Sequence, residues 1–239
     1  MIDFEIERII PLCEKFGVNI DEEAKKRLNL YGNLLISWNE KINLTAITEP
    51  KEVLFKHFYD SILLLKAVSI PKGAKTVDVG TGAGFPGMVI KIVRTDLEVT
   101  LLDSLNKRLV FLNDVIEKTG LSGVKTVHIR AEDAGKSPDF REKFDIAAAR
   151  AVAAMPKLLE YCVPLVSKNG LFVAMKGPSV FEEITASGNL CRDLGCKEPE
   201  IITETLTGEE ERIFCIYKKI SQTSPKYPRK PKKTPKQPN

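Results

Sequence analysis

One glycine-rich stretch, residues 76–87, constrains the fold of this chain more than any other. It reads Thr-Val-Asp-Val-Gly-Thr-Gly-Ala-Gly-Phe-Pro-Gly, so a β-favouring run containing Asp78 leads into glycines at alternate positions, Gly80, Gly82 and Gly84. Glycines at this density allow backbone conformations that other residues avoid, and they let a ligand approach the backbone closely. The stretch therefore predicts a strand, a tight turn and a helix opening near Pro86, arranged to bind a nucleotide-type cofactor.

Strands and helices alternate from this stretch onward. Five β-favouring runs alternate with helical segments, and two further runs are joined by a short Gly-Glu-Glu-Glu turn. The predicted strands are residues 76–80, 97–103, 124–130, 144–149, 170–176, 200–206 and 212–218, and the predicted helices are residues 86–94, 104–118, 155–166 and 180–194. Repeated β-α units predict an α/β fold with a mostly parallel sheet covered on both faces. The short final turn makes the last two strands an antiparallel hairpin.

The chain divides into three parts on this reading. Residues 1–70 have apolar positions at helical spacing, with Asp21 and Glu49-Pro50 as helix starts, and they form an N-terminal helical extension. Residues 71–220 form the Rossmann-like domain. Residues 221–239 carry six Lys and Arg and no acid, which predicts a flexible basic tail. Removing these six from the net charge of +4 leaves −2 on the first 220 residues, so the basicity favours a tail that contacts a polyanion. A merely solubilising tail is the alternative.

Composition excludes several classes of protein. No run approaches the roughly 18 apolar residues of a membrane span, and the acidic start does not resemble a signal peptide. The five cysteines are scattered without a CxxC pair, which favours reduced thiols in the cytoplasm. Only two histidines, His57 and His128, are present, so we expect no metal site. We expect His57 to be hydrogen-bonded within its helical segment to a neighbour such as Asp60, with RNA contact or closure of the cofactor pocket as alternatives.

Two cofactor fingerprints overlap in the glycine stretch. Residues 82–87 satisfy GxGxxG, the nicotinamide signature, which is weak alone. Residues 78–84 satisfy an acid two positions before GxGxG, the pattern of S-adenosylmethionine-dependent methyltransferases. At the strand end, the carboxylate of Asp78 can orient a cationic amino-acid group, directly or through water, whereas it would gain nothing from a pyrophosphate. This favours S-adenosylmethionine.

Further candidates follow the other strands. Asp103 ends the second strand, where an acid can accept both ribose hydroxyls of adenosine, and helix capping is its structural alternative. Ala131 and Glu132 follow the third strand and can hydrogen-bond an adenine edge; for Glu132 a capping role is again the alternative. Arg150 follows the fourth strand between small residues, where its planar guanidinium suits a base, a phosphate or a carboxylate. These positions share the carboxyl edge of the predicted sheet, where open α/β sheets bind ligands.

Several long blocks of the sequence resemble one family, the bacterial small-subunit ribosomal RNA guanine-N7 methyltransferases G, also called glucose-inhibited division protein B. The similarity runs almost end to end. Its blocks are residues 38–45 (Trp-Asn-Glu-Lys-Ile-Asn-Leu-Thr), 56–61 (Lys-His-Phe-Tyr-Asp-Ser), 78–87, 103–108 (Asp-Ser-Leu-Asn-Lys-Arg), 149–151 (Ala-Arg-Ala) and 227–229 (Tyr-Pro-Arg). The resemblance implies a class I methyltransferase fold, with a seven-stranded sheet ending in an antiparallel hairpin. It also implies methyl transfer from S-adenosylmethionine to N7 of a guanine in 16S ribosomal RNA, either free or within a small subunit or assembly particle.

The resemblance also implies the site residues. Cofactor contacts would come from Gly80, Phe85, the Ala131-Glu132 pair and Arg150, and Arg150 would position a reactant without acid-base chemistry. Asp78, Gly82, Gly84 and Asp103 are added on the physical grounds above. The tail departs from the family pattern after Arg229, which weakens the expected RNA contact there. A nicotinamide oxidoreductase, a non-catalytic ribosome-binding module and a small-molecule methyltransferase are the alternative functions.

Overall fold

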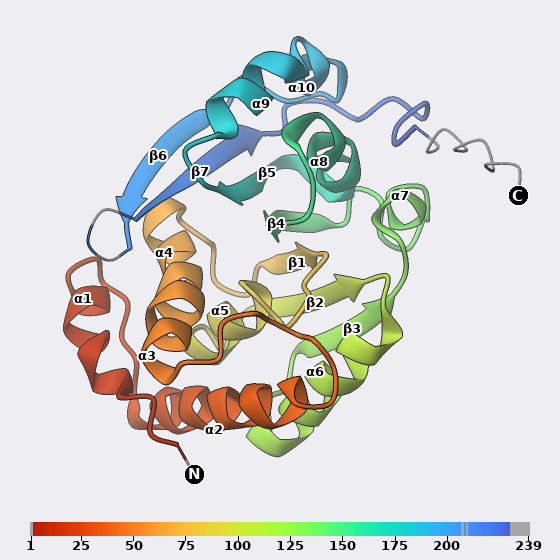
Figure 1. The fold of residues 1–239 in the computed structure, drawn as a ribbon. Helices are drawn as coiled ribbons and strands as arrows, with labels where there is room; N and C mark the ends of the chain where they lie inside the picture. The colour runs from red at the N-terminus through yellow and green to blue at the C-terminus, as the bar shows by residue number, and fades with distance from the viewer. Residues whose placement is uncertain (1, 207, 209, 230–239) are drawn as a thin grey trace, which may run out of the picture.

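A computed structural model describes residues 2–206, 208 and 210–229. Its centre is one seven-stranded sheet in the order β3-β2-β1-β4-β5-β7-β6 (Figure 1). The strands are β1 Lys75–Val79, β2 Glu98–Asp103, β3 Val124–His128, β4 Phe144–Arg150, β5 Val166–Lys176, β6 Glu200–Thr205 and β7 Glu211–Lys218. The first five pair in parallel, while β7 pairs antiparallel with both β5 and β6. The predicted α/β fold and its terminal hairpin are confirmed.

Helices cover both faces of the sheet (Figure 1). They are α1 Ile10–Glu14, α2 Glu22–Asn39, α3 Pro50–Val53, α4 Asp60–Ala67, α5 Gly87–Val93, α6 Asn106–Thr119, α7 Ala131–Ala134, α8 Met155–Cys162, α9 Val180–Ser187 and α10 Leu190–Asp193. One apolar core joins α1–α6 to the sheet, and a second lies under α8 and α10 on the opposite face. The single helix predicted at residues 180–194 is two helices, because Gly188 with φ 51° interrupts it.

The N-terminal helices start where the sequence predicts. The Asp21 carboxylate accepts a hydrogen bond from the Ala24 backbone N–H at 2.7 Å, and the Glu49 carboxylate accepts one from Glu52 N–H at 2.8 Å. The apolar stripe of α2, which includes Leu28, is buried in the same core as α5 and α6. The helical extension therefore packs as part of the main body. Between α3 and α4 lies a π-helical segment, Leu54–Tyr59, a rare geometry that is frequent at functional sites.

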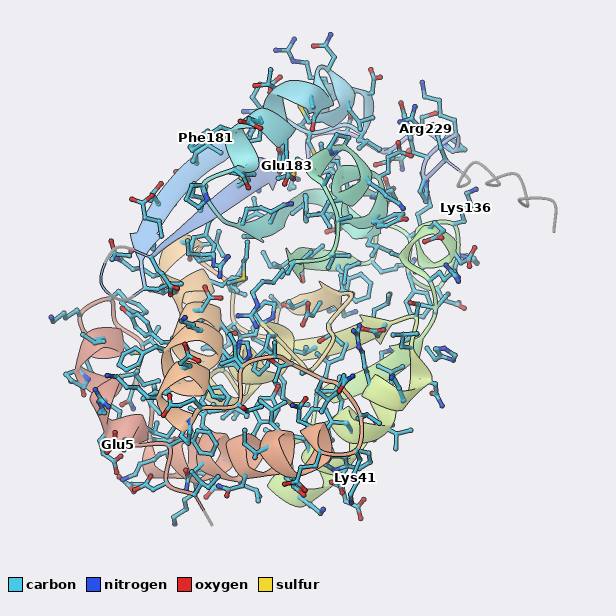
Figure 2. All side chains as sticks on the ribbon, in the orientation of Figure 1. Glu5, Lys41, Lys136, Phe181, Glu183 and Arg229 are labelled. Carbon is cyan, nitrogen blue, oxygen red and sulfur yellow. The ribbon has the colours of Figure 1, made fainter. Side chains whose placement is uncertain are left out.

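The prediction of a flexible tail from residue 221 is wrong for residues 221–229. Tyr227 is only 4% exposed, and the Arg229 guanidinium and backbone N–H both donate to the nearly buried carboxylate of Glu160 in α8. Arg141 donates to the carbonyls of Thr223 at 2.6 Å and of Tyr227 at 2.9 Å. These contacts fix the segment beside α7 and α8, and Figure 2 shows Arg229 on the same side of the molecule as Lys136, which follows α7. The remaining predicted tail, residues 230–239, lies outside the described residues.

We expect two C-terminal deletions to differ in stability. Removing residues 226–239 exposes the site of Tyr227 and leaves the Glu160 carboxylate without Arg229, which together cost on the order of 3 kcal/mol. For a domain of this size that is a Tm lower by roughly 6–12 °C. Removing residues 230–239 alone, the matched control, should leave Tm within about 2 °C. Calorimetry of both variants measures the difference, and equal Tm values would show that residues 226–229 add nothing.

Candidate active site

The turn between β1 and α5 is built from glycines with positive φ. Gly80, Gly82 and Gly84 have φ values of 68°, 60° and 103°, a region that favours glycine. The N–H groups of Gly80 and Thr81 donate to the Leu102 carbonyl at 2.8 and 3.0 Å, which ties the turn to the end of β2. α5 begins at Gly87, directly after Pro86, so the predicted helix start is displaced by one residue. The turn leaves open space above the carboxyl ends of the strands.

Asp78 is fully buried beneath this turn. One carboxylate oxygen, Oδ2, accepts hydrogen bonds from the Thr81 hydroxyl at 2.6 Å and the Gly87 backbone N–H at 2.8 Å. Burial raises the pKa of this carboxyl group to about 6, although both hydrogen bonds oppose the shift. Its side chain does not line the cavity described next. The glycine turn folds back over the carboxylate, and Oδ1 has no hydrogen-bond partner within the described residues, so the contact between Asp78 and the cofactor stays a prediction.

A cavity of about 390 Å³ lies at the carboxyl ends of β1, β2, β3 and β4, and we call it the glycine-loop cavity. It brings together four of the predicted site residues: Gly80, Asp103, Ala131 and Glu132. Ile129, Val152 and Tyr161 supply apolar wall, and Arg108 and Arg130 stand at its edge. Such a cavity, with apolar walls and an acid, fits an adenosine group.

Asp103 holds the turn and faces this cavity at once. Its Oδ2 accepts from the Gly82 backbone N–H at 2.9 Å and from Arg108 at 3.3 Å, and its Oδ1 accepts from Leu105 N–H at 2.8 Å. Its side chain is only 3% exposed. These hydrogen bonds fix the direction of the carboxylate, and Oδ1, which accepts one of them, has a further lone pair for a hydroxyl group. The N-cap of α6 is Leu105 without a side-chain cap, and the contact between Asp103 and the cofactor stays a prediction.

The other predicted residues lie beside the glycine-loop cavity. Gly84 packs against Tyr31 and Leu112, which leave no room for a side chain. Phe85 is 6% exposed and stacks on the His57 ring with centroids 4.4 Å apart. The Arg150 guanidinium lies 4.9 Å from the centroid of the Phe85 ring. Gly82, Gly84 and Phe85 thus shape the cavity from behind rather than line it.

A second cavity of about 570 Å³, which we call the Arg150 cavity, adjoins the first at Ala151. Ala151 lines both cavities and has φ 55°, a left-handed conformation that turns the chain sharply after β4. Cationic side chains of Lys56, Arg150 and Arg212 line the second cavity, together with His57, Pro178, Leu206, Glu210 and Glu211. Two ligands, one in each cavity, would therefore meet beside Arg150.

Comparison with known proteins identifies the family. A family model described as rRNA small subunit methyltransferase G matches residues 24–212. The chain belongs to that family. A curated relative from Clostridium perfringens (strain 13 / Type A), named Ribosomal RNA small subunit methyltransferase G, is 49% identical over 219 residues, which cover 91% of this chain and 92% of the relative. A relative of the same name from Acetivibrio thermocellus is 48% identical over 93% of this chain and 92% of its own.

Solved structures agree on the fold of this methyltransferase. A predicted O-methyltransferase from Agrobacterium tumefaciens has a TM-score of 0.53 at 17% identity, covering 65% of this chain and 78% of that one. A SAM-dependent O-methyltransferase from Thermotoga maritima has a TM-score of 0.52 at 14% identity, covering 80% and 73%. At these identities the likeness shows the class I methyltransferase fold alone. With the family membership, the resemblance, the enzyme class and the S-adenosylmethionine cofactor predicted from the sequence are confirmed.

The described residues contain neither a membrane-spanning helix nor a cluster of metal ligands. Within residues 2–206, 208 and 210–229, no helix is long and apolar enough to cross a membrane. In the same part of the chain, no cluster of three or more His, Cys, Asp or Glu side chains is arranged to hold a metal ion.

His57 and Asp60 do not form the expected hydrogen bond in the described structure of this methyltransferase. The His57 Nε2 atom lies 2.9 Å from the Thr45 hydroxyl, and Nδ1 lies 3.0 Å from the Lys56 carbonyl and 3.3 Å from Arg150. Asp60 binds two arginines instead, at 2.6 Å each. The π-helical turn causes this, since it directs His57 toward Phe85 while Asp60 points to the sheet.

We expect His57 to make the methyltransferase less stable in acid. Burial and the nearby Arg150 lower its pKa from 6.5 to about 4, so the unfolded chain takes up a proton first as pH falls. Stability from this group is complete above pH 6.5 and is lost as pH falls through 4, by about 3 kcal/mol. Urea unfolding at several pH values should show a smaller acid loss in His57→Gln. His128→Gln, at an exposed histidine of β3, is the matched control, and an identical pH profile for both variants would contradict the prediction.

Some site residues were not predicted from the sequence. Asp60, Arg212, Tyr161 and Ala151 lie in four different elements or loops, and only the fold brings them together. A signal for Asp60 existed, since an aspartate within the apolar run of α4 is rarely buried without a partner. Arg212 lies near the start of β7, where a charged residue is common, so nothing in the sequence around it indicated a role.

Proposed function

We propose that this chain transfers the methyl group of S-adenosylmethionine to N7 of a guanine in 16S ribosomal RNA of the small subunit. The observation that carries the proposal is the junction of the two cavities at Ala151. One cavity fits a nucleoside cofactor. The other is about 570 Å³, large enough for a nucleotide, and is lined by three cationic side chains and two glutamates. The names of the two relatives support ribosomal RNA of the small subunit as the substrate.

The residues of the glycine-loop cavity fit the cofactor. Asp103 would accept the ribose hydroxyls, while Ala131 and Glu132 would bind the adenine edge beside the Tyr161 wall. Gly80 packs closely against Val152 in the cavity wall, because a Cβ there would meet Val152 at 2.9 Å. When bound, S-adenosylmethionine supplies an electrophilic methyl group on a sulfonium.

The protein supplies orientation in this reaction. N7 of guanine carries a lone pair, so no proton has to leave before attack, and His57 is not needed as a base. Its pKa of about 4 keeps it neutral at physiological pH, stacked on Phe85. Arg150 keeps its charge and positions a reactant through a fixed guanidinium plane. Alignment of this kind is worth roughly 7–11 kcal/mol when the reacting atoms are held in line.

The Arg150 cavity would receive the guanine and its phosphate. Its cations, Lys56, Arg150 and Arg212, suit a polyanion, and its apolar lining from Ile47, Pro178 and Leu206 suits a base. A base stacked within RNA must be extruded or presented in a loop to enter such a cavity. We propose that the partner is the 16S RNA, free or within a subunit or assembly particle, and that the enzyme therefore acts in the cytoplasm.

Transfer of labelled methyl groups to under-modified small subunits tests the function. Incubation with labelled S-adenosylmethionine, followed by mass mapping of the RNA, should give one N7-methylated guanine. Equilibrium binding of NADH without S-adenosylmethionine would instead support an oxidoreductase. Cofactor binding without transfer to RNA or to subunits would support a non-catalytic module or a small-molecule methyltransferase.

A further inference from the structure

We infer that Asp60 is a positioning residue, a buried carboxylate that holds Arg150 and Arg212 in a fixed relation where the two cavities meet. The inference rests on the proposed function. It adds that Arg212 presents a donor to a phosphate oxygen of the RNA, while Arg150 stays against Phe85 where the two cavities meet. Asp60 itself touches neither substrate.

Arg150 and Arg212 both donate hydrogen bonds to the carboxylate of Asp60. Asp60 is the first residue of α4 and is 0% exposed. Its Oδ2 accepts from Arg150 Nη1 at 2.6 Å, while Oδ1 accepts from Arg212 Nε at 2.6 Å and Oδ2 from Arg212 Nη2 at 3.0 Å. Arg150 ends β4 and Arg212 lies near the start of β7, with β5 between the two strands. One carboxylate thus ties a helix to two strands of the sheet.

The arginines keep free donors toward the Arg150 cavity. Arg212 uses Nε and Nη2 on Asp60, and within the described residues its Nη1 has no hydrogen-bond partner. Its side chain is 19% exposed, and that of Arg150 is 10% exposed. The cluster of Asp60, Arg150 and Arg212 carries a net charge of +1. Glu210 and Glu211 also line this cavity, and Glu210 pairs with Lys56 at 3.2 Å. A phosphate oxygen is the acceptor that such a fixed, charged N–H group binds best.

Stability alone does not account for the cluster. A buried ion pair gains little over apolar side chains of similar volume, because desolvation offsets the attraction. The pair does fix direction, since without the carboxylate the two guanidinium groups would repel each other. The backbone carbonyl of Lys56, in the π-helical segment, also accepts a hydrogen bond from Arg150 Nη1 at 3.1 Å. The cluster therefore uses several polar groups to orient two arginines.

A double-mutant cycle tests this role, with Asp60→Asn, Arg212→Gln and the double variant assayed on small subunits. We expect D60N to lower kcat/KM by about 100-fold, as for a misplaced binding group. R212Q should raise the KM for subunits at least about tenfold with the Kd for S-adenosylmethionine within about twofold, because it removes one of the few fixed phosphate contacts. The double variant should be no worse than D60N, because Asp60 acts through Arg212 and Arg150.

Asp96→Asn is the matched control. Asp96 also accepts two hydrogen bonds from an arginine, Arg94, at 2.7 and 2.8 Å, but it lies away from both cavities. We expect D96N to change Tm without changing kcat/KM. Melting temperatures and circular dichroism accompany every variant.

Three outcomes overturn the inference. These are a D60N enzyme with kcat/KM within about twofold of the wild type, losses that multiply in the double variant, and an equal loss of activity in D96N. Should D60N not fold, R212Q decides alone, and an unchanged KM for subunits overturns the phosphate contact. A wild-type enzyme that methylates no RNA would refute the proposed function instead, and an active wild type with an unaffected D60N refutes only this inference.

Discussion

Replacing Arg150 by lysine should lower kcat/KM for RNA methylation by about 100-fold while leaving the fold intact. The guanidinium donates to the Asp60 carboxylate and to the Lys56 carbonyl, and its plane lies over the Phe85 ring. A lysine ammonium keeps the charge but cannot make these directed contacts together. The change therefore isolates geometry from charge at the junction of the two cavities.

Initial rates with labelled S-adenosylmethionine and under-modified subunits measure this effect, with equilibrium dialysis for cofactor affinity. Arg192→Lys is the matched control, because Arg192 forms an exposed ion pair with Glu198, its side chain being 65% exposed. Full activity in Arg150→Lys would show that Arg150 contributes only its charge.

Replacing Gly84 by alanine should cost about 2–5 kcal/mol of folding stability. Its φ of 103° disfavours any side chain, and a Cβ would come within 2.6 Å of the Tyr31 hydroxyl and 2.9 Å of the Met88 Cβ. Left-handed strain of about 1–2 kcal/mol adds to overpacking of about 1–3 kcal/mol. The Tyr31 hydroxyl also donates to the Ala83 carbonyl, so the added methyl group disturbs a buried hydrogen bond.

Gly82→Ala is the matched control for this loop. Gly82 has φ 60°, but a Cβ there would meet only the Gly80 carbonyl at 3.9 Å. Its replacement should cost only the conformational strain, about 1–2 kcal/mol. Urea unfolding of both variants measures the difference, and equal losses would mean that the space around Gly84 is not restrictive.

Residues at strand ends were predictable because the alternation of apolar strands and helices in the sequence shows where each strand ends. Asp103, Ala131 and Glu132 each follow a clear apolar strand, and parallel strands bring their carboxyl ends to one edge. The structure places all three in the glycine-loop cavity. Whether they bind the cofactor there stays a prediction. For Asp78 the pattern located the residue along its strand but not the turn that folds over its carboxylate, and its contact with the cofactor also stays a prediction.

Contacts between distant segments were not predictable. Asp60 binds Arg150 and Arg212, which lie 90 and 152 residues later in the chain, and no local pattern links them. The C-terminal segment misled for a related reason. Its composition is polar and proline-rich, yet Tyr227 and Arg229 dock it by one buried ring and one ion pair. Composition measures the average of a segment, whereas docking depends on two residues.

The docked C-terminal segment has a consequence for the order in which the molecule is completed. Glu160 precedes Tyr161, which lines the glycine-loop cavity, and within the described residues its carboxylate pairs with the guanidinium of Arg229. Ribosomes make the chain from the N-terminus, so every strand of the sheet is synthesised before this partner exists. A nascent chain that has reached β7 still has unpaired polar groups at Glu160 and Arg141. Docking of residues 221–229 therefore follows synthesis of the sheet, and a chain terminated near residue 225 would have every strand but lack the contact between Arg229 and Glu160.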